Sequence, residues 1–324
     1  MPNKPFSFII YICSYLMIVY KDSGSLPRLN KAIITIGVFD GVHLGHQKVL
    51  QQLLSEAEQM GGTPVLITFH PHPRKVLDQS GSSPLYVLNS LDEKLNLLEK
   101  FGIPYTVVVP FTEAFANFTA EEYVRDFLVE KFHPHTVILG YDHKFGKDRK
   151  GDYHLLDQLA AKYGFNAKEI PERIIRNITI SSTKIREALL LGDIATANEF
   201  LGYAYPLSGE VVAGNKKGRT IGFPTANLAL SDADKIVPGV GVYAVKVSLG
   251  NRSLKGMMNI GFRPTVGGTF RTLEVNILDF DEDIYGEVLT VHFLQRLRDE
   301  QKFNGLYELK AQLEKDREQA RAVS

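Results

Sequence analysis

Apolar positions in the first two-thirds of the chain come in short unbroken runs, separated by stretches with helical spacing. The runs cover residues 33–38, 64–69, 105–109 and 136–139 and are rich in Val, Ile and Thr. Continuous apolar runs of this length are typical of strands buried on both faces. Helices are predicted between them, over 45–59, 91–101 and 120–131. This alternation predicts a parallel, doubly wound α/β sheet, whose ligands gather at the carboxyl ends of the strands.

The pattern changes after Pro206 to short strands with frequent Gly and Pro. Six strands are predicted, over 211–213, 225–228, 242–247, 254–260, 273–278 and 288–294. That number is typical of a small closed or nearly closed antiparallel barrel. Phe303, Leu306, Leu309 and Leu313 recur at helical spacing, so an amphipathic helix is expected to pack on the barrel. Between the two patterns, a β-rich run at 174–180 leads to helices over 181–191 and 194–201.

Chain length, composition, net charge and cysteine count narrow the class of protein. A chain of 324 residues is expected to form two domains, and its 44% hydrophobic and 23% charged residues are ordinary for a soluble globular protein. Thirty-seven basic and 37 acidic residues leave no net field, so neither nucleic acid nor a membrane surface is indicated as a partner. Cys13 is the single cysteine, which excludes an internal disulfide and fits a reducing cytoplasm.

The N-terminal segment does not fit this class. Phe6–Tyr20 is apolar and follows Lys4, as in the core of a signal peptide, but no A-x-A-like cleavage site follows. It is also shorter than the about 20 apolar residues that a transmembrane helix needs. We favour a third interpretation, in which translation begins at Met17 and residues 1–16 are an extension. A first domain over 17–202 and a second over 203–324 would follow.

The turn after the first predicted strand carries the clearest chemistry. Gly37 and Gly41 allow a tight turn, Gly45 begins a helix, and His43 and His46 lie three residues apart. A strand, a glycine turn and a helix start form a cradle for phosphate, because free N–H groups and the helix dipole face the anion. Either histidine could donate a hydrogen bond to phosphate oxygens as charge builds on them. The alternative is a turn with two surface histidines.

Three later loops add polar groups. His70–Arg74 alternates prolines, which predicts an extended segment without a helix; its His-x-His spacing would also suit a metal, but no acidic cluster lies nearby. Gly140–Asp152 is locally basic and could neutralise a triphosphate, or be a solvated turn. Ser181–Arg186 opens a helix whose hydroxyls could cap free N–H groups, and Arg186 lies within one turn of them, where it could bind phosphate.

The string G-x-F-D-G-V-H-x-G-H at 37–46 resembles nucleotidyltransferases that move AMP or CMP onto a phosphate, and closely the bacterial bifunctional riboflavin kinase/FAD synthetases. T-F-x-P-H-P at 68–73, G-x-D-F-x-F-G-x-x-x-x-G-D at 140–152 and I-S-S-T-x-I-R at 180–186 match the same family, with His143 where Phe is usual. The resemblance implies catalytic roles for His43, His46 and Arg186. It implies nucleotide or phosphate binding by Gly37, Phe39, Asp40, Gly41, Gly45, Asp142, Lys147, Arg149, Ser181, Ser182 and Thr183. It implies flavin binding by Phe69, Pro71, His72 and Pro73.

The second half carries strings similar to the kinase of this family. G-N-K-K-G-R at 214–219 is by itself a weak phosphate signal, but G-F-P-T-A-N follows at 222–227. The resemblance implies that Thr225 and Asn227 bind Mg²⁺ with ATP, since Mg²⁺ takes hard oxygen ligands. Glu274 in L-E-V-N matches the family's catalytic Glu, a base for the ribityl hydroxyl, with Asn276 in place of the commoner His. Nucleotide binding is implied for Gly214, Lys217, Gly218, Arg219, Gly222 and Pro224, and flavin binding for Arg298.

The resemblance covers about residues 17–321. It implies a Rossmann-like nucleotidyltransferase domain followed by a six-stranded kinase barrel. The implied activity is the ATP-dependent phosphorylation of riboflavin to FMN, followed by adenylylation of FMN to FAD with release of pyrophosphate. Two alternatives remain open: a riboflavin kinase whose nucleotidyltransferase half is silent, and a flavin-binding regulator without turnover.

Overall fold

The structure, a computed structural model, describes residues 16–21, 27–78, 85–170, 180–214, 217–265 and 268–323. The chain divides into two compact units. The first comprises Met1–Val38, Gln47–Gln79 and Leu91–Arg176, and the second comprises Phe39–His46, Ser80–Ser90 and Asn177–Ser324. Residues 1–15 and 171–179 lie outside the described part, and with them nearly all of the N-terminal extension and of the strand predicted at 174–180.

The first unit contains a six-stranded sheet in which every neighbouring pair is parallel, as predicted. Its strands are β1 (Ile18–Tyr20), β2 (Ala32–Ile36), β3 (Thr63–His70), β4 (Tyr105–Pro110), β5 (Pro134–Gly140) and β6 (Asn166–Ile170), in the order β1-β4-β3-β2-β5-β6. The chain adds β3 and β4 on one side of β2, then β5 and β6 on the other. The strand order therefore reverses at the carboxyl end of β2, the usual ligand position in such sheets.

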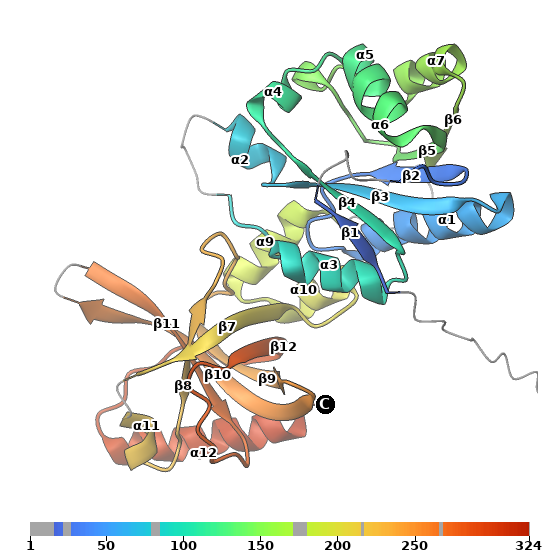
Figure 1. Cartoon of the computed structure of the whole chain (residues 1–324). Coiled ribbons are helices and arrows are strands. Elements are labelled where there is room, and N and C mark those ends of the chain that lie inside the picture. The colour runs from blue at the N-terminus through green and yellow to red at the C-terminus, as the bar shows by residue number, and fades with distance from the viewer. Residues whose placement is uncertain are drawn as a thin grey trace, which may run out of the picture. The chain divides into compact units, whose positions relative to one another are not determined.

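Helices cover both faces of this sheet (Figure 1). One face carries α1 (Leu44–Met60) and α3 (Leu91–Lys100). The other carries α5 (Ala120–Glu122), the π-helix η2 (Tyr123–Val129), α6 (Glu130–Phe132) and α7 (Tyr153–Tyr163). All five residues of β2 are buried, and Ile34 and Ile36 share a core cluster with Tyr123 and Phe127 of η2. Burial on both faces explains why these strands read as continuous apolar runs. The unit also contains α4 (Glu113–Ala116) and the 3₁₀ turn η3 (Lys147–Arg149).

The segment after β3 corrects the expectation of an extended chain. Helix α2 (Pro73–Leu77) begins within it, with His72 as its N-cap. The His72 Nδ1 atom accepts a hydrogen bond from the Arg74 backbone N–H at 3.2 Å. Proline is favourable at the first helical position, because its φ is already helical and its missing N–H would have no helical partner there. Pro73 therefore starts a helix instead of preventing one.

The second unit contains the closed antiparallel barrel that the change of pattern predicts. Its six strands are β7 (Pro206–Val212), β8 (Ala226–Leu230), β9 (Gly241–Leu249), β10 (Arg252–Thr265), β11 (Gly268–Ile277) and β12 (Val288–Arg298), in the order β10-β11-β8-β7-β12-β9. Tyr243, Val291 and Phe293 are fully buried in its core. Most of these strands are longer than predicted. The added ends of β10 and β12 include the exposed residues Arg252, Ser253 and Gln295, which lack an apolar signature.

The second unit also contains the helices α9 (Ser182–Leu191), α10 (Ile194–Leu201), α11 (Lys217–Thr220) and α12 (Leu306–Ala322). The expected C-terminal helix packs on the barrel, where Ala320 and Leu313 join a cluster with Ala244 and Met257 (Figure 1). Leu306 is not part of that contact, since it is 68% exposed at the first position of α12.

Candidate functional site

The turn between β2 and α1 is held tight by its backbone. Phe39 and Val42 have positive φ angles of 50° and 35°, and Gly41 has a φ of 85°. Such angles persist only where the surroundings enforce them, and they concentrate at functional sites. A Cβ on Gly41 would lie 2.6 Å from Leu88 Cδ1, and the Gly41 carbonyl accepts a hydrogen bond from the Tyr203 hydroxyl at 2.6 Å. The turn therefore has one defined conformation.

The two histidines of this turn are stacked on each other. Their ring centroids are 3.7 Å apart and their planes are inclined by 17°. His43 is 7% exposed, and its Nδ1 atom accepts a hydrogen bond from the His46 backbone N–H at 3.3 Å. Because an imidazole nitrogen that accepts carries no proton, the neutral His43 ring has its proton on Nε2. That tautomer has the donor that a phosphate ligand requires.

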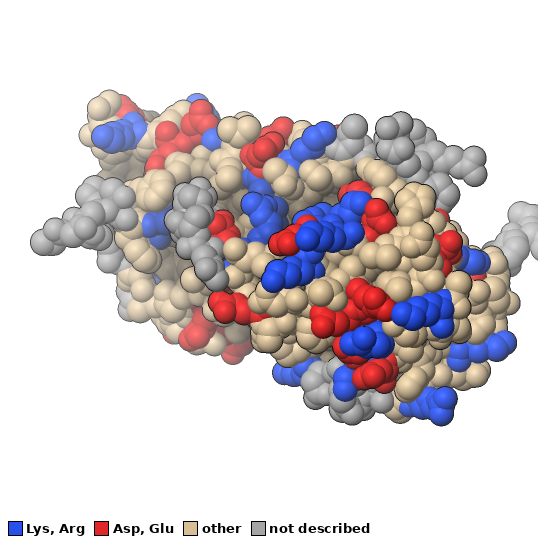
Figure 2. Space-filling model, turned by 90° about the horizontal axis from the view of Figure 1, so that it is seen from above, with Lys and Arg blue, Asp and Glu red and all other residues tan. Residues whose placement is uncertain are grey.

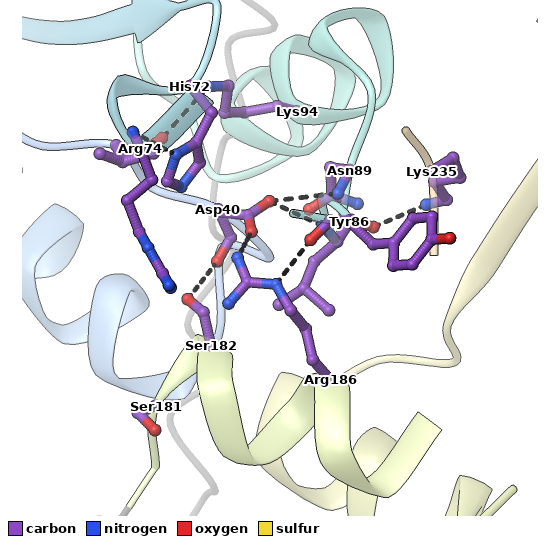
Figure 3. Close-up of polar contacts among 12 residues, drawn as sticks. Asp40, His72, Arg74, Tyr86, Asn89, Lys94, Ser181, Ser182, Arg186 and Lys235 are labelled. Atoms are coloured by element: carbon purple, nitrogen blue, oxygen red, sulfur yellow. Dashed lines mark hydrogen bonds and ion pairs between the residues drawn. The ribbon is translucent and has the colours of Figure 1, made fainter. Parts of the chain in front are cut away.

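Asp40 joins three segments of the second unit (Figure 3). Its side chain is buried, and its Oδ1 atom accepts from the backbone N–H groups of Leu88 and Asn89 at 2.9 and 3.3 Å. Its Oδ2 atom pairs with Arg186, and its carbonyl accepts from Ser182 Oγ at 2.9 Å. A buried carboxylate with these partners positions the turn; the nucleotide contact expected for Asp40 stays a prediction.

Arg186 is engaged by the same network. Its side chain is 13% exposed, and its Nε atom donates to the Tyr86 carbonyl at 2.7 Å while Nη2 pairs with Asp40. Ser181 is the N-cap of α9 and accepts from the Lys184 N–H at 3.3 Å, so its hydroxyl has the capping role that was the alternative to phosphate binding. Thr183 lies exposed in the first turn of α9.

A buried lysine lies at the carboxyl ends of β2 and β3, and the sequence patterns do not reveal it. Lys94 is 6% exposed, and its Nζ atom donates to the Val38 carbonyl and to Thr68 Oγ1, both at 3.1 Å. The sequence signal is weak, because a lysine in an amphipathic helix is more often exposed. Lys94 adds a positive charge near the sheet edge where anionic ligands bind.

The residues expected to bind flavin in the first unit have different surroundings. Phe69 is 7% exposed and packs edge-to-face on Phe111 with ring centroids 5.6 Å apart, so it is a core residue. Pro71, His72 and Pro73 follow at the carboxyl end of β3 and are partly or fully exposed. Of the four residues expected to bind flavin in this unit, these three lie at the surface, where a ligand could reach them.

The basic loop after β5 is ordered around Phe145, which is buried and shares two backbone hydrogen bonds with Gly151. Lys144 pairs with Asp152 at 3.2 Å, and Lys150 pairs with Asp148 at 3.5 Å. The local positive charge is therefore partly neutralised within the loop. Among the residues expected to bind the nucleotide, Asp142, Lys147 and Arg149 are all exposed.

His143 occupies the position where the family has Phe. Its ring plane is inclined by 30° to that of Phe145, with centroids 6.5 Å apart. Burial of the ring lowers the pKa of His143 to about 4, and the nearby Asp142 opposes this shift only in part. His143 is therefore neutral at pH 7 and keeps an aromatic contact.

Three residues that the sequence predicts to serve the kinase lie where β8 and β11 pair. Glu274 lies opposite Asn227 in the antiparallel register, and Thr225 immediately precedes β8. The Thr225 hydroxyl donates to Glu274 Oε2 at 3.5 Å. Asn276, which replaces the commoner His, donates from Nδ2 to the Pro224 carbonyl at 2.6 Å and so fixes the start of β8. The structure thus brings together the predicted base and the two predicted metal ligands.

The glycines before β8 allow close backbone contacts. A Cβ on Gly218 would lie 2.2 Å from the Phe223 carbonyl oxygen, and Gly222 has a φ of 83°. A Cβ on Gly214 would likewise lie only 2.0 Å from Asn227 Nδ2. Residues 215 and 216 and the Lys217 side chain lie outside the described part, so the role expected of Lys217 stays a prediction.

A pocket opens beside this cluster. Its walls include Arg219, Pro224 and Thr225, together with the apolar side chains of Val275, Ile277, Phe280 and Ile284. It is also lined by three consecutive acidic residues, 281–283, and by Tyr285. An apolar wall next to polar residues suits an aromatic base with attached phosphates.

Arg298, for which flavin binding stays a prediction, forms an ion pair with α12. Its Nε and Nη2 atoms donate to the Asp316 carboxylate at 2.7–3.0 Å, and Asp316 is fully buried in α12. Gln312 also donates to Asp316, at 2.8 Å. This bidentate ion pair fixes α12 against the end of β12.

Within the described ranges, no group of three or more His, Cys, Asp or Glu side chains could hold a metal ion. The hydroxyl and amide oxygens of Thr225 and Asn227, next to a carboxylate, do fit Mg²⁺ carried in with a nucleotide. No helix of the described residues is long and apolar enough to cross a membrane. On the face shown in Figure 2, Lys and Arg side chains are interspersed with Asp and Glu, as the balanced totals of the sequence would suggest.

Comparison with known proteins covers both halves of the chain. Two family models match: FAD synthetase over residues 26–184 and riboflavin kinase over residues 201–324. The chain is 39% identical over 294 residues to the bifunctional riboflavin kinase/FMN adenylyltransferase of Bacillus subtilis, covering 90% of this chain and 92% of that protein. It is 40% identical over 290 residues to the protein of the same name from Escherichia coli K12, covering 89% and 91%.

A solved structure matches nearly the whole chain as well. It is the crystal structure of a protein named macrolide-efflux protein, from Streptococcus pneumoniae, with a TM-score of 0.84 at 31% identity; the match covers 95% of this chain and 99% of that one. The parallel nucleotidyltransferase-like sheet and the closed kinase-like barrel define a two-part transferase. The chain belongs to the family of bifunctional riboflavin kinase/FMN adenylyltransferases. The family predicted from the motifs is thereby confirmed.

Proposed function

We propose that this chain makes FAD in two ATP-dependent steps. Riboflavin is first phosphorylated to FMN, and FMN is then adenylylated to FAD with release of pyrophosphate. The observation that carries the proposal is the meeting of Glu274, Thr225 and Asn227 on paired strands, in a chain that also holds an ordered His-x-Gly-His turn. We assign adenylyl transfer to residues 17–202 and the kinase to 203–324, and we expect the enzyme to act in the cytoplasm.

In the kinase step, Glu274 takes the proton of the ribityl hydroxyl as its oxygen attacks the γ-phosphorus of ATP. A hydroxyl has a high pKa, so a nearby carboxylate base assists the attack. Thr225 and Asn227 would hold Mg²⁺, which neutralises the charge of the phosphates. The Thr225 hydroxyl also orients Glu274 through their hydrogen bond. The adenine of ATP would occupy the pocket beside Arg219 and Pro224, with its phosphates near the glycines at 214, 218 and 222.

In the adenylyl-transfer step, the nucleophile is a phosphate oxygen of FMN. The second pKa of such a phosphate is near 6, so the dianion is abundant at neutral pH and no general base is needed. The protein aligns this oxygen with the α-phosphorus and stabilises the charge that passes to pyrophosphate. The Nε2–H group of His43 and the N-terminus of α9 supply donors for that purpose. His46 and the exposed cations Lys147 and Arg149 are further candidates.

A chromatographic assay of the purified chain with riboflavin, ATP and Mg²⁺ tests the proposal. FMN should accumulate first and FAD later. Glu274→Gln should lower FMN formation about 10²–10⁴-fold and leave FAD formation from added FMN intact. His43→Ala should lower only FAD formation, by about 10²-fold or more.

The alternatives give other results in the same assay. FMN without FAD from the unaltered chain would identify a kinase with a silent nucleotidyltransferase half. Riboflavin that binds but yields neither product would identify a flavin-binding regulator, and the proposal would then be abandoned.

A further inference from the structure

A segment of four residues in the second unit, Tyr86–Asn89, is hydrogen-bonded on two sides; we call it the strap. On one side it meets the nucleotidyltransferase motifs (Figure 3). Its last two amide groups, those of Leu88 and Asn89, donate to Asp40, and its first carbonyl accepts from Arg186. The conformation of the strap therefore sets where these two charged side chains lie.

On its other side the strap pairs with residues 234–236, a segment of the kinase half between β8 and β9. The Val87 N–H donates to the Asp234 carbonyl at 2.7 Å, and the Val87 carbonyl accepts from the Ile236 N–H at 3.0 Å, which makes a short parallel bridge. Between these bonds, Lys235 Nζ donates to the Leu88 carbonyl at 2.6 Å. The backbone groups of the strap are thus bonded to both halves: those of Val87 to the kinase half only, and those of Leu88 to one half through the N–H and to the other through the carbonyl.

Lys235 and Asp40 hold opposite ends of a single peptide group. The Leu88 carbonyl accepts from Lys235, and the Asn89 N–H of the same peptide donates to Asp40. Lys235 is 4% exposed and lies over the ring of Tyr205, 4.4 Å from its centroid, so its position is fixed. A cation at the oxygen and a carboxylate at the N–H polarise the peptide and strengthen both hydrogen bonds.

The strap also carries a buried amide. The Asn89 side chain is 5% exposed, and neither its Oδ1 nor its Nδ2 atom has a hydrogen-bond partner within the described residues. Buried polar atoms of this kind usually serve a ligand or a bound water. The strap therefore fixes Asp40, Arg186 and the Asn89 amide together.

We infer that Lys235, a residue of the kinase half, is a positioning residue for adenylyl transfer. It acts through the Leu88–Asn89 peptide on Asp40 and Arg186, and it touches no substrate. This inference rests on the proposed adenylyltransferase function. Its consequence is that the adenylyl-transfer site is incomplete without the segment at 234–236 of the kinase half.

Lys235→Met in the full chain tests the inference through the two activities of the same molecule. The turnover of FMN to FAD should fall tenfold or more, since small displacements of aligned groups are costly in rate. Riboflavin phosphorylation should stay within twofold of the unaltered chain, and the KM for FMN should change much less than kcat. Lys235→Arg, which keeps a cation, should restore most of the FAD formation. Lys310→Met, which removes an exposed lysine of α12, is the matched control and should change neither activity.

A double variant gives the decisive comparison. Because Lys235 and Asp40 act on one peptide, Lys235→Met combined with Asp40→Asn should be little worse than the poorer single variant. The inference would be overturned if the rate loss of the double variant equalled the product of the two single losses. Normal FAD formation by Lys235→Met would overturn it as well. If Lys235→Met loses both activities through misfolding, Lys235→Gln replaces it under the same criteria. An unaltered chain that makes no FAD from FMN would instead refute the proposed function.

Discussion

Gly214 lies against the side chain of Asn227: a Cβ at position 214 would stand 2.0 Å from Asn227 Nδ2. Real Cβ atoms do not approach a polar atom to that distance, so Gly214→Ala must displace the Asn227 amide. Because Asn227 is a proposed ligand of Mg²⁺ opposite Glu274, we expect riboflavin kinase kcat/KM to fall at least tenfold, with adenylyl transfer unchanged. The measurement is the initial rate of each reaction.

Gly305→Ala is the control for that variant. A Cβ on Gly305 meets nothing within 4 Å, and its φ of −170° is open to any residue. Equal kinase rates for Gly214→Ala and Gly305→Ala would contradict the assignment of Asn227 to the metal-nucleotide site.

Thr225 offers a test of the metal proposal that keeps the fold. Thr225→Val has the same shape but lacks the hydroxyl, whereas Thr225→Ser keeps it. We expect the Val variant to need at least tenfold more Mg²⁺ for half-maximal kinase rate, because one hard oxygen ligand is missing. The Ser variant should stay near the unaltered chain. Identical Mg²⁺ curves for Val and Ser would show that the hydroxyl does not serve the metal.

His143 predicts a dependence of stability on pH. Burial lowers the pKa of His143 to about 4 in the folded chain, whereas an unfolded histidine titrates near 6.5. Between these values the unfolded chain binds more protons, so the free energy of unfolding decreases as the pH falls from about 6.5 towards 4. His143→Phe, which restores the family's residue, removes this contribution.

The size of the effect at His143 is modest because the ring is only half-buried. Relative to the unaltered chain, His143→Phe should become more stable by about 1 kcal/mol between pH 7 and pH 5. Denaturant unfolding of both chains at the two pH values measures it. A difference that does not change with pH would show that His143 is not buried in its neutral form.

Sequence patterns predict the parts of the fold in which burial is uniform. Strands β2 to β5 are covered on both faces, so their apolar runs stand out, and the helices α1 and α3 are followed within two residues by Gly61 and Gly102. Strand β6 escapes prediction because it is an edge strand with mostly exposed side chains. Helix α2 escapes it because proline breaks helices at most positions, whereas Pro73 stands at the first helical position.

The candidate sites are predictable where a motif lies within one short stretch. His43, Thr225 and Glu274 fall in such stretches, and the structure places the last two side by side. The network of Asp40 and Lys235 is not predictable, because its partners are separated by up to 147 residues along the chain. Local sequence does not say which backbone groups a buried charge will meet after folding.

Substitutions in the ion pair of Arg298 and Asp316 can show whether Arg298 only anchors α12 or also binds flavin. Asp316 is fully buried, so Asp316→Asn leaves the Arg298 guanidinium, whose side chain is only 14% exposed, without its carboxylate. Removing one partner of a buried ion pair is strongly destabilising, by about 3 kcal/mol. We expect the kinase activity of Asp316→Asn to be lost at a lower urea concentration, with adenylyl transfer as the internal comparison.

The double variant Arg298→Met with Asp316→Leu decides between the two roles. Apolar residues of similar volume can replace a buried ion pair without loss of stability. If Arg298 only anchors α12, the double variant should regain urea resistance and keep the KM for riboflavin of the unaltered chain. If Arg298 also binds flavin, urea resistance will return while the KM for riboflavin rises tenfold or more, because a charged hydrogen-bond donor is missing from the site.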